Sequence, residues 1–177
     1  IGVSMLALLI VMTTYFSNSG GSLFLKTKKV QADTGETTLA MSQAMSRNKI
    51  PAIGRAASEG LWAMTAGGHR VFCLNSGKTM CSGDTLKYKT VNAATYEKKG
   101  IAKALQWYFM KSNKNTKALA LTQAYIWACG HGANKQNTVY QAGKNVQKGY
   151  SQNDAKKFCE TISDQDPEGT IYYYTVK

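Results

Sequence analysis

The sequence predicts an α+β fold, and two observations lead to this expectation. Strand-like runs dominate the first half of the chain, helix-like runs fill most of the second half, and a last strand-like run ends it. The composition, with 44% hydrophobic and 18% charged residues, is that of a globular protein and argues against wholesale disorder. A length of 177 residues suits one domain, or one domain with a targeting segment.

The chain starts with an uncharged, mostly apolar run at residues 2–16. This run has the length of a signal-peptide core and is short of the roughly 20 residues that a membrane-spanning helix needs. Because the first residue is Ile1 rather than Met, we expect a truncated N-terminus with the basic part of the leader upstream. A membrane anchor that has lost its first turn is the alternative.

Two positions suit cleavage of this leader, one directly after Ser17-Asn18-Ser19 and one after Ala32. We favour the second, because Val30-Gln31-Ala32 has small residues at the right offsets and Asp33 opens a polar sequence. The expected organisation is therefore a signal peptide at 1–32 and one domain at 33–177. That domain is either secreted freely or is the N-terminal module of a longer surface protein.

The elements of the domain follow from hydrophobic spacing and from glycine or proline breaks. A weak pattern predicts a short helix over 38–46, and Ala66-Gly67-Gly68 predicts a hairpin turn. Apolar spacing marks a largely buried helix over 118–129, which Gly130 and Gly132 end. The remaining expected elements are strands at 61–65, 69–74, 88–91 and 171–176, a loop at 75–84, and helices at 101–111, 138–148 and 154–163.

The formal net charge of +12 suits an anionic neighbour such as a cell-wall polymer, a membrane surface or an acidic glycan. Nucleic acid is not expected, because the lysines are scattered and Arg47, Arg55 and Arg70 are isolated. The four cysteines form no C-x-x-C pair, which excludes a zinc ribbon and a thioredoxin-type site. We therefore expect no metal and no cofactor.

Chemistry is indicated by a cysteine at the end of a strand and a glutamine inside a buried helix, Cys73 and Gln123. Burying a carboxamide without partners costs about 1–3 kcal/mol, so something should compensate Gln123. Trp127, four residues later, shares its helical face and would exclude water. A thiolate held against a carboxamide can expel ammonia and leave a thioester, and such positioning is worth an effective molarity of roughly 10⁵ M or more.

The segments Phe-Cys-Leu-Asn at 72–75 and Thr-Gln-Ala-Tyr-Ile-Trp at 122–127 resemble the two signatures of thioester domains, which lie at the tips of Gram-positive surface adhesins. In that family the cysteine lies in an aromatic-Cys-aliphatic-Asp/Asn segment and the glutamine in a Thr-Gln-x-x-aliphatic-Trp helix. These positions match Cys73 and Gln123, with Thr122 and Trp127 in their motif places. The likeness covers most of residues 33–177 in order.

The resemblance implies an antiparallel sheet or partial barrel packed with a helical subdomain. It also implies covalent capture of an amine, typically a lysine of a host surface protein, by the Cys73–Gln123 thioester at the cell surface. Phe72 and Trp127 would shield this bond and Thr122 would orient the glutamine. The event forms one intermolecular amide and is no turnover, so we do not expect an enzyme. Anionic surface polymers are further possible partners, and the membrane is expected to be met only through the leader.

The sequence departs from the family pattern in two ways. Asn75 stands where many members carry Asp, and Cys81, Cys129 and Cys159 are added to a family whose members are often otherwise poor in cysteine. If Cys73 is in a thioester, at most one disulfide forms among these three. A Cys129–Cys159 bridge would tie two helices, and Cys81 could replace either partner.

Three other interpretations stay open. The four cysteines could form two ordinary disulfides in an exported protein. Cys73 could be the nucleophile of a secreted cysteine hydrolase or acyltransferase, with His131 as base and Asn134 or Asn137 to orient it. The lysines and the tyrosine run at 172–174 could form a non-covalent cationic module that binds wall polymers or glycans.

Overall fold

The computed structural model describes residues 8–13, 34–51, 58–74 and 80–177 of the chain. Its elements confirm the expected α+β class. The strands are β1 (Leu8–Thr13), β2 (Thr34–Pro51), β3 (Ser58–Ala66), β4 (His69–Cys73), β5 (Thr85–Asn92) and β6 (Thr170–Val176). The helices are α1 (Lys99–Met110), α2 (Thr116–His131), α3 (Lys135–Val146) and α4 (Gln152–Ser163). Within these ranges no helix has the length and apolar character needed to cross a membrane.

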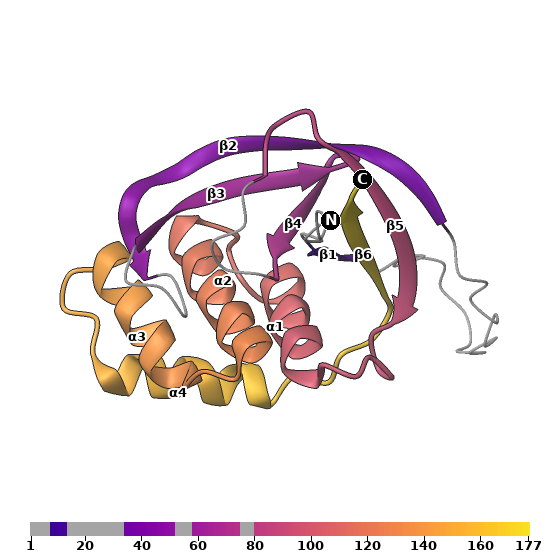
Figure 1. The fold of residues 1–177 in the computed structure, drawn as a ribbon. Coiled ribbons are helices and arrows are strands. Elements are labelled where there is room, and N and C mark those ends of the chain that lie inside the picture. The colour runs from indigo at the N-terminus through magenta and orange to yellow at the C-terminus, as the bar shows by residue number, and fades with distance from the viewer. Residues whose placement is uncertain (1–7, 14–33, 52–57, 75–79) are drawn as a thin grey trace.

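All pairings in the sheet are antiparallel, and the strands follow the order β1-β4-β3-β2-β5-β6. The sheet closes because β1 also pairs with β6 along its whole length. Figure 1 shows the long strands β2 and β3 arching over the helices, while β4, β5 and β6 stand at one end. Without β1, the other five strands would form a curled, open half-barrel.

Strand β1 lies inside the segment predicted to be a leader. Its backbone pairs with β4 through Leu9 and Ile10 and with β6 from Leu8 to Thr13. The predicted cleavage after Ala32 lies outside the described residues and stays a prediction. Such a cut would remove β1 and open the sheet between β4 and β6, leaving two strand edges without their ladder partner.

The hairpin expected around Ala66-Gly67-Gly68 is confirmed by β3 and β4. Ala66 pairs with His69, so Gly67 and Gly68 form a two-residue turn with φ of +56° and +82°. Positive φ at both central residues is the requirement of a type I′ turn, which glycine meets without strain.

The short helix expected over 38–46 is wrong, because these residues belong to β2. They pair with β3 on one side, and the start of β2 pairs with β5 on the other. The mixture of Thr, Ala, Met and Gln here has no strong local preference, so pairing on both sides decides the conformation. A register shift between Gln43 and Met45 bends this strand over the helical layer.

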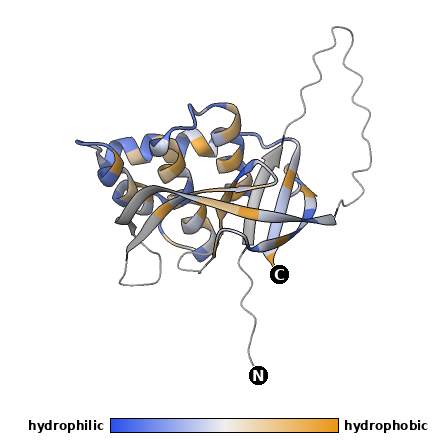
Figure 2. Cartoon of the chain, turned by 90° about the horizontal axis from the view of Figure 1, so that it is seen from above, coloured by the Kyte–Doolittle hydropathy of each residue, from blue (hydrophilic) through white to orange (hydrophobic). Residues whose placement is uncertain are grey.

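The four helices pack on the concave side of the sheet, and α4 runs across the ends of the other three in Figure 1. Their positions confirm the four expected helices with shifted ends. Helix α4 begins at a capping box in which the side chains of Ser151 and Asp154 bond to each other's backbone, so it starts at Gln152, two residues before the expected start. Figure 2 shows hydrophilic residues along the outer side of the helical layer, so the core lies between helices and strands.

Candidate functional site

Helix α2 and strand β4 form the candidate site at the centre of the core. Asn115 begins α2, because its side chain accepts a hydrogen bond from the backbone N–H of Ala118 at 2.9 Å. Gly132 ends the helix in a left-handed conformation, as expected of a C-cap. Every residue from 118 to 128 is buried, so the helix needs partners for any polar side chain it carries.

The carboxamide of Gln123 bonds to the backbone of Cys73 in both directions. The Cys73 backbone N–H donates to Oε1 of Gln123 at 3.0 Å. The Nε2 group of Gln123 in turn donates to the Cys73 carbonyl oxygen at 2.6 Å. The two residues predicted to react are therefore held in contact, although they are 50 positions apart in the sequence.

These two hydrogen bonds explain how a carboxamide can be buried in the core without the free-energy cost of an unpaired polar group. Gln123 is 3% exposed and Cys73 is 5% exposed. The Gln123 carboxamide forms hydrogen bonds with two main-chain groups of β4, as a neighbouring strand would. The same two bonds provide partners for both polar atoms of the carboxamide. The hydrogen-bond partners that we expected a buried Gln123 to need are thus backbone atoms of Cys73.

Close approach of α2 to β4 also depends on a small residue near the end of the helix. A Cβ atom at Gly130 would lie 3.0 Å from the carbonyl oxygen of Leu74. That separation is tighter than ordinary van der Waals contact, so a larger residue would push the helix away from the strand. Gly130 therefore helps to set the distance between the two elements that carry Cys73 and Gln123.

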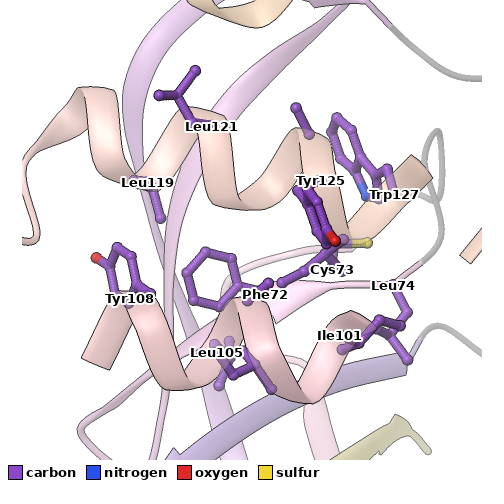
Figure 3. Packing of buried hydrophobic residues seen from close by; sticks show 14 of the residues in the cluster. Phe72, Cys73, Leu74, Ile101, Leu105, Tyr108, Leu119, Leu121, Tyr125 and Trp127 are labelled. Carbon is purple, nitrogen blue, oxygen red and sulfur yellow. The ribbon is translucent and has the colours of Figure 1, made fainter. Parts of the chain in front are cut away.

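The predicted shielding and orienting residues Phe72, Thr122 and Trp127 are all buried. Figure 3 shows Phe72 and Trp127 on different elements of the core. Trp127 is on α2 one turn beyond Gln123, and its indole N–H has no hydrogen-bond partner among the described residues. The Thr122 hydroxyl likewise has none there, and its role in orienting Gln123 stays a prediction. Phe72 packs edge-on against Tyr108 of α1, with ring centroids 4.8 Å apart.

The other cysteines lie in two separate places. Cys81 is exposed in the turn before β5, where its N–H donates to Asp84. Cys129 and Cys159 are half-buried on α2 and α4, and burial raises the pKa of each thiol to about 11. Cys129 lies close enough to add to the rise in the pKa of Cys159. All three carry free thiols in this structure.

The residues of the alternative interpretations are more scattered. His131 is exposed at the last position of α2, two turns or about 12 Å along the helix from Gln123. The side chain of Asn134 caps α3 by accepting from the N–H of Asn137. In the tyrosine run, Tyr172 and Tyr174 pack with Tyr88, whereas Tyr173 lies under Lys89. Within the described ranges no three His, Cys, Asp or Glu side chains are grouped as metal ligands.

The sequence predicted that Cys73 and Gln123 lie together, but it did not predict that the backbone of Cys73 is the hydrogen-bond partner of Gln123. No side-chain pattern could have revealed it, because every residue carries the same N–H and C=O groups.

Comparison of the chain with models of protein families, with curated proteins and with solved structures found no match.

Proposed function

We propose that this chain is a covalent adhesin domain whose Cys73 and Gln123 form an internal thioester that captures an amine. The observation that carries the proposal is the pair of hydrogen bonds between the Gln123 carboxamide and the Cys73 backbone in a dry core. The matching sequence signatures add support.

The first step would join the Cys73 sulfur to the side-chain acyl carbon of Gln123. The thiol proton and the carboxamide nitrogen leave together as ammonia, and Oε1 carries negative charge in the tetrahedral intermediate. The Cys73 N–H already donates to this oxygen at 3.0 Å, so a donor is in place where the charge develops. The Cys73 carbonyl holds the nitrogen that must leave.

The second step would transfer the acyl group to a partner. A primary amine, such as a lysine side chain on a host surface protein, attacks the acyl carbon, an amide forms and the Cys73 thiol is regenerated. Because Gln123 and Cys73 are almost fully buried, water has little access to the thioester before the amine arrives. The capture happens once for each molecule. The predicted leader places it at the cell surface, after export of the protein.

Intact mass spectrometry tests this function directly. The thioester predicts a mass lower by one ammonia, and incubation with methylamine should then add the mass of one methylamine, giving a methylamide that is one CH₂ heavier than the chain with an unreacted Gln123. Cys73→Ala should abolish both effects, whereas the matched variant Cys81→Ala, which removes an exposed thiol, should abolish neither.

Other outcomes would favour a different function. Full mass with no methylamine uptake contradicts the thioester, and mass shifts that respond to reductant instead indicate disulfides. Repeated turnover of an acyl substrate that is lost in His131→Ala would identify a cysteine hydrolase.

A further inference from the structure

A cavity lies on the side of α2 that faces away from Gln123. Its volume is about 530 Å³, and it opens between the end of α1, the start of α2 and helix α4. Leu121 lines it and is about 200° around the helix from Gln123. The volume is in the range of small-molecule sites. This cavity is therefore separate from the Cys73–Gln123 pair.

The apolar part of the cavity is aromatic. Trp107 and Phe158 line it and meet edge to face, with ring centroids 4.9 Å apart. Tyr150 lines it too, is 6% exposed, and its buried hydroxyl has no hydrogen-bond partner among the described residues. A buried hydroxyl without a partner is unfavourable, so a polar ligand group reaching it would be stabilised.

The rim of the cavity is positively charged. Lys111, Lys117 and Lys157 line it against a single carboxylate, that of Asp154. This carboxylate already accepts hydrogen bonds from the N–H and the hydroxyl of Ser151 at 2.8 and 2.7 Å. Because Asp154 is held by the cap of α4, the lysines dominate the field at the opening.

The start of α2 adds to this field. Asn115 and Lys117 of the cavity lie at the N-terminus of the helix, whose first turn contains no acidic residue. The partial positive charge of a helix N-terminus stabilises an anion placed beside it. Ser112 and Asn113 supply further polar side chains at the same opening.

We propose that this cavity binds an anionic sugar ring of an acidic polysaccharide. The acid group, a carboxylate or a sulfate, would lie at the lysines and the start of α2. The C–H faces of the ring would pack on Trp107 and Phe158, and the ring hydroxyls would bond to the neighbouring amide and hydroxyl side chains. This binding goes beyond the covalent capture and does not depend on it.

The test uses the full chain with Cys73→Ala, so that no covalent bond can form. Fluorescence anisotropy would measure binding of labelled hyaluronan oligosaccharides, which carry carboxylates, and of chondroitin sulfate oligosaccharides, which also carry sulfates. We expect binding to at least one, weakened by added salt, and none to neutral dextran. Hyaluronan alone would identify the carboxylate as sufficient, and chondroitin sulfate alone would identify the sulfate as required.

Matched variants locate the site. Lys117→Gln with Lys157→Gln should weaken binding about tenfold, whereas Lys144→Gln with Lys148→Gln, the same loss of charge near the end of α3, should change it less than about twofold. Tyr150→Phe should also weaken binding without lowering the urea concentration at which the chain unfolds. Equal losses in both lysine pairs, binding of dextran, or equally tight binding of poly-glutamate would overturn the proposal.

Discussion

The polar groups on the two sides of helix α2 differ in burial and in hydrogen bonding. On one side, the Gln123 carboxamide is almost fully buried and both of its polar atoms bond to the Cys73 backbone. On the other, Leu121 faces a cavity whose charged groups are mostly exposed lysines. The first arrangement holds the atoms that the proposed thioester chemistry would use, and the second leaves charged side chains in contact with water, where they are accessible to a ligand.

This difference determines which substitutions should lower the free energy of unfolding most. A buried polar group that loses its fixed partner has no water to replace it, so the full desolvation penalty appears. An exposed lysine that is removed leaves only water behind, and the free energy of unfolding changes little.

Gln123→Ala should be the most destabilising of these changes. It removes the hydrogen bonds that Gln123 makes with the N–H and the carbonyl oxygen of Cys73 inside the core. At about 1–3 kcal/mol for each bond, the free energy of unfolding should fall by roughly 2–6 kcal/mol in urea titrations.

Cys73→Ala is the matched comparison, because it keeps both backbone hydrogen bonds and removes only the thiol. Both variants should lose methylamine uptake, yet Cys73→Ala should cost only about 1 kcal/mol of stability. If the two variants were equally stable, the hydrogen bonds would not be what holds Gln123 in the core.

The thiols of Cys129 and Cys159 should react slowly in the folded protein. A pKa of about 11, against an ordinary value of 9.0, lowers the thiolate fraction at neutral pH by about a hundredfold. Timed alkylation followed by peptide mass spectrometry should show this slowing in buffer and lose it in urea, and equal rates in both would contradict it.

The same pKa shifts predict how stability depends on pH. Both thiols bind their protons more tightly in the folded chain than in the unfolded chain, so their contribution to stability is complete below about pH 9. It is lost as the pH rises towards about 11. Replacing both residues with Ala should flatten this part of the curve.

Gly143→Ala tests the wall of the cavity. A Cβ atom at this position of α3 would overlap the ring of Tyr150. Overpacking of this kind costs about 1–3 kcal/mol. In the double variant with Tyr150→Ala the cost of the added methyl should largely disappear, which urea titrations of the four chains in the cycle would show. Additive costs would mean that the two residues do not meet.

Lys117→Gln should have the smallest effect on stability, within about 0.5 kcal/mol, because Lys117 is exposed at the cavity rim. Its effect should appear in glycan binding and hardly at all in urea titrations. A large loss of stability would show that this rim is part of the structural core.

The parts of the fold that could be predicted are those with strong local signals. The glycines at 67–68 specify a turn with positive φ, and the apolar run at 118–129 specifies a buried helix, so both were found. The segment at 38–46 has no such signal, and its strand conformation comes from pairing with β3 and β5, which lie elsewhere in the sequence.

The candidate site divides in the same way. Cys73 and Gln123 could be named from the residues and the resemblance, but their contact through backbone atoms could not. The cavity of Trp107, Tyr150 and Phe158 was also missed, because it exists only where three helices meet. Spacing within one element gives no information on such a meeting.

The hydrogen bond from Gln123 to the Cys73 carbonyl bears on what happens after capture. The nitrogen of a captured lysine would take the place of Nε2 and would carry one hydrogen. The hydrogen that Nε2 now donates lies on the same side as Oε1, because both atoms bond to the backbone of Cys73, whereas in a trans secondary amide the lysine chain occupies that side. Capture would therefore break the 2.6 Å bond to the Cys73 carbonyl, and the link to the partner would run through Gln123 into helix α2.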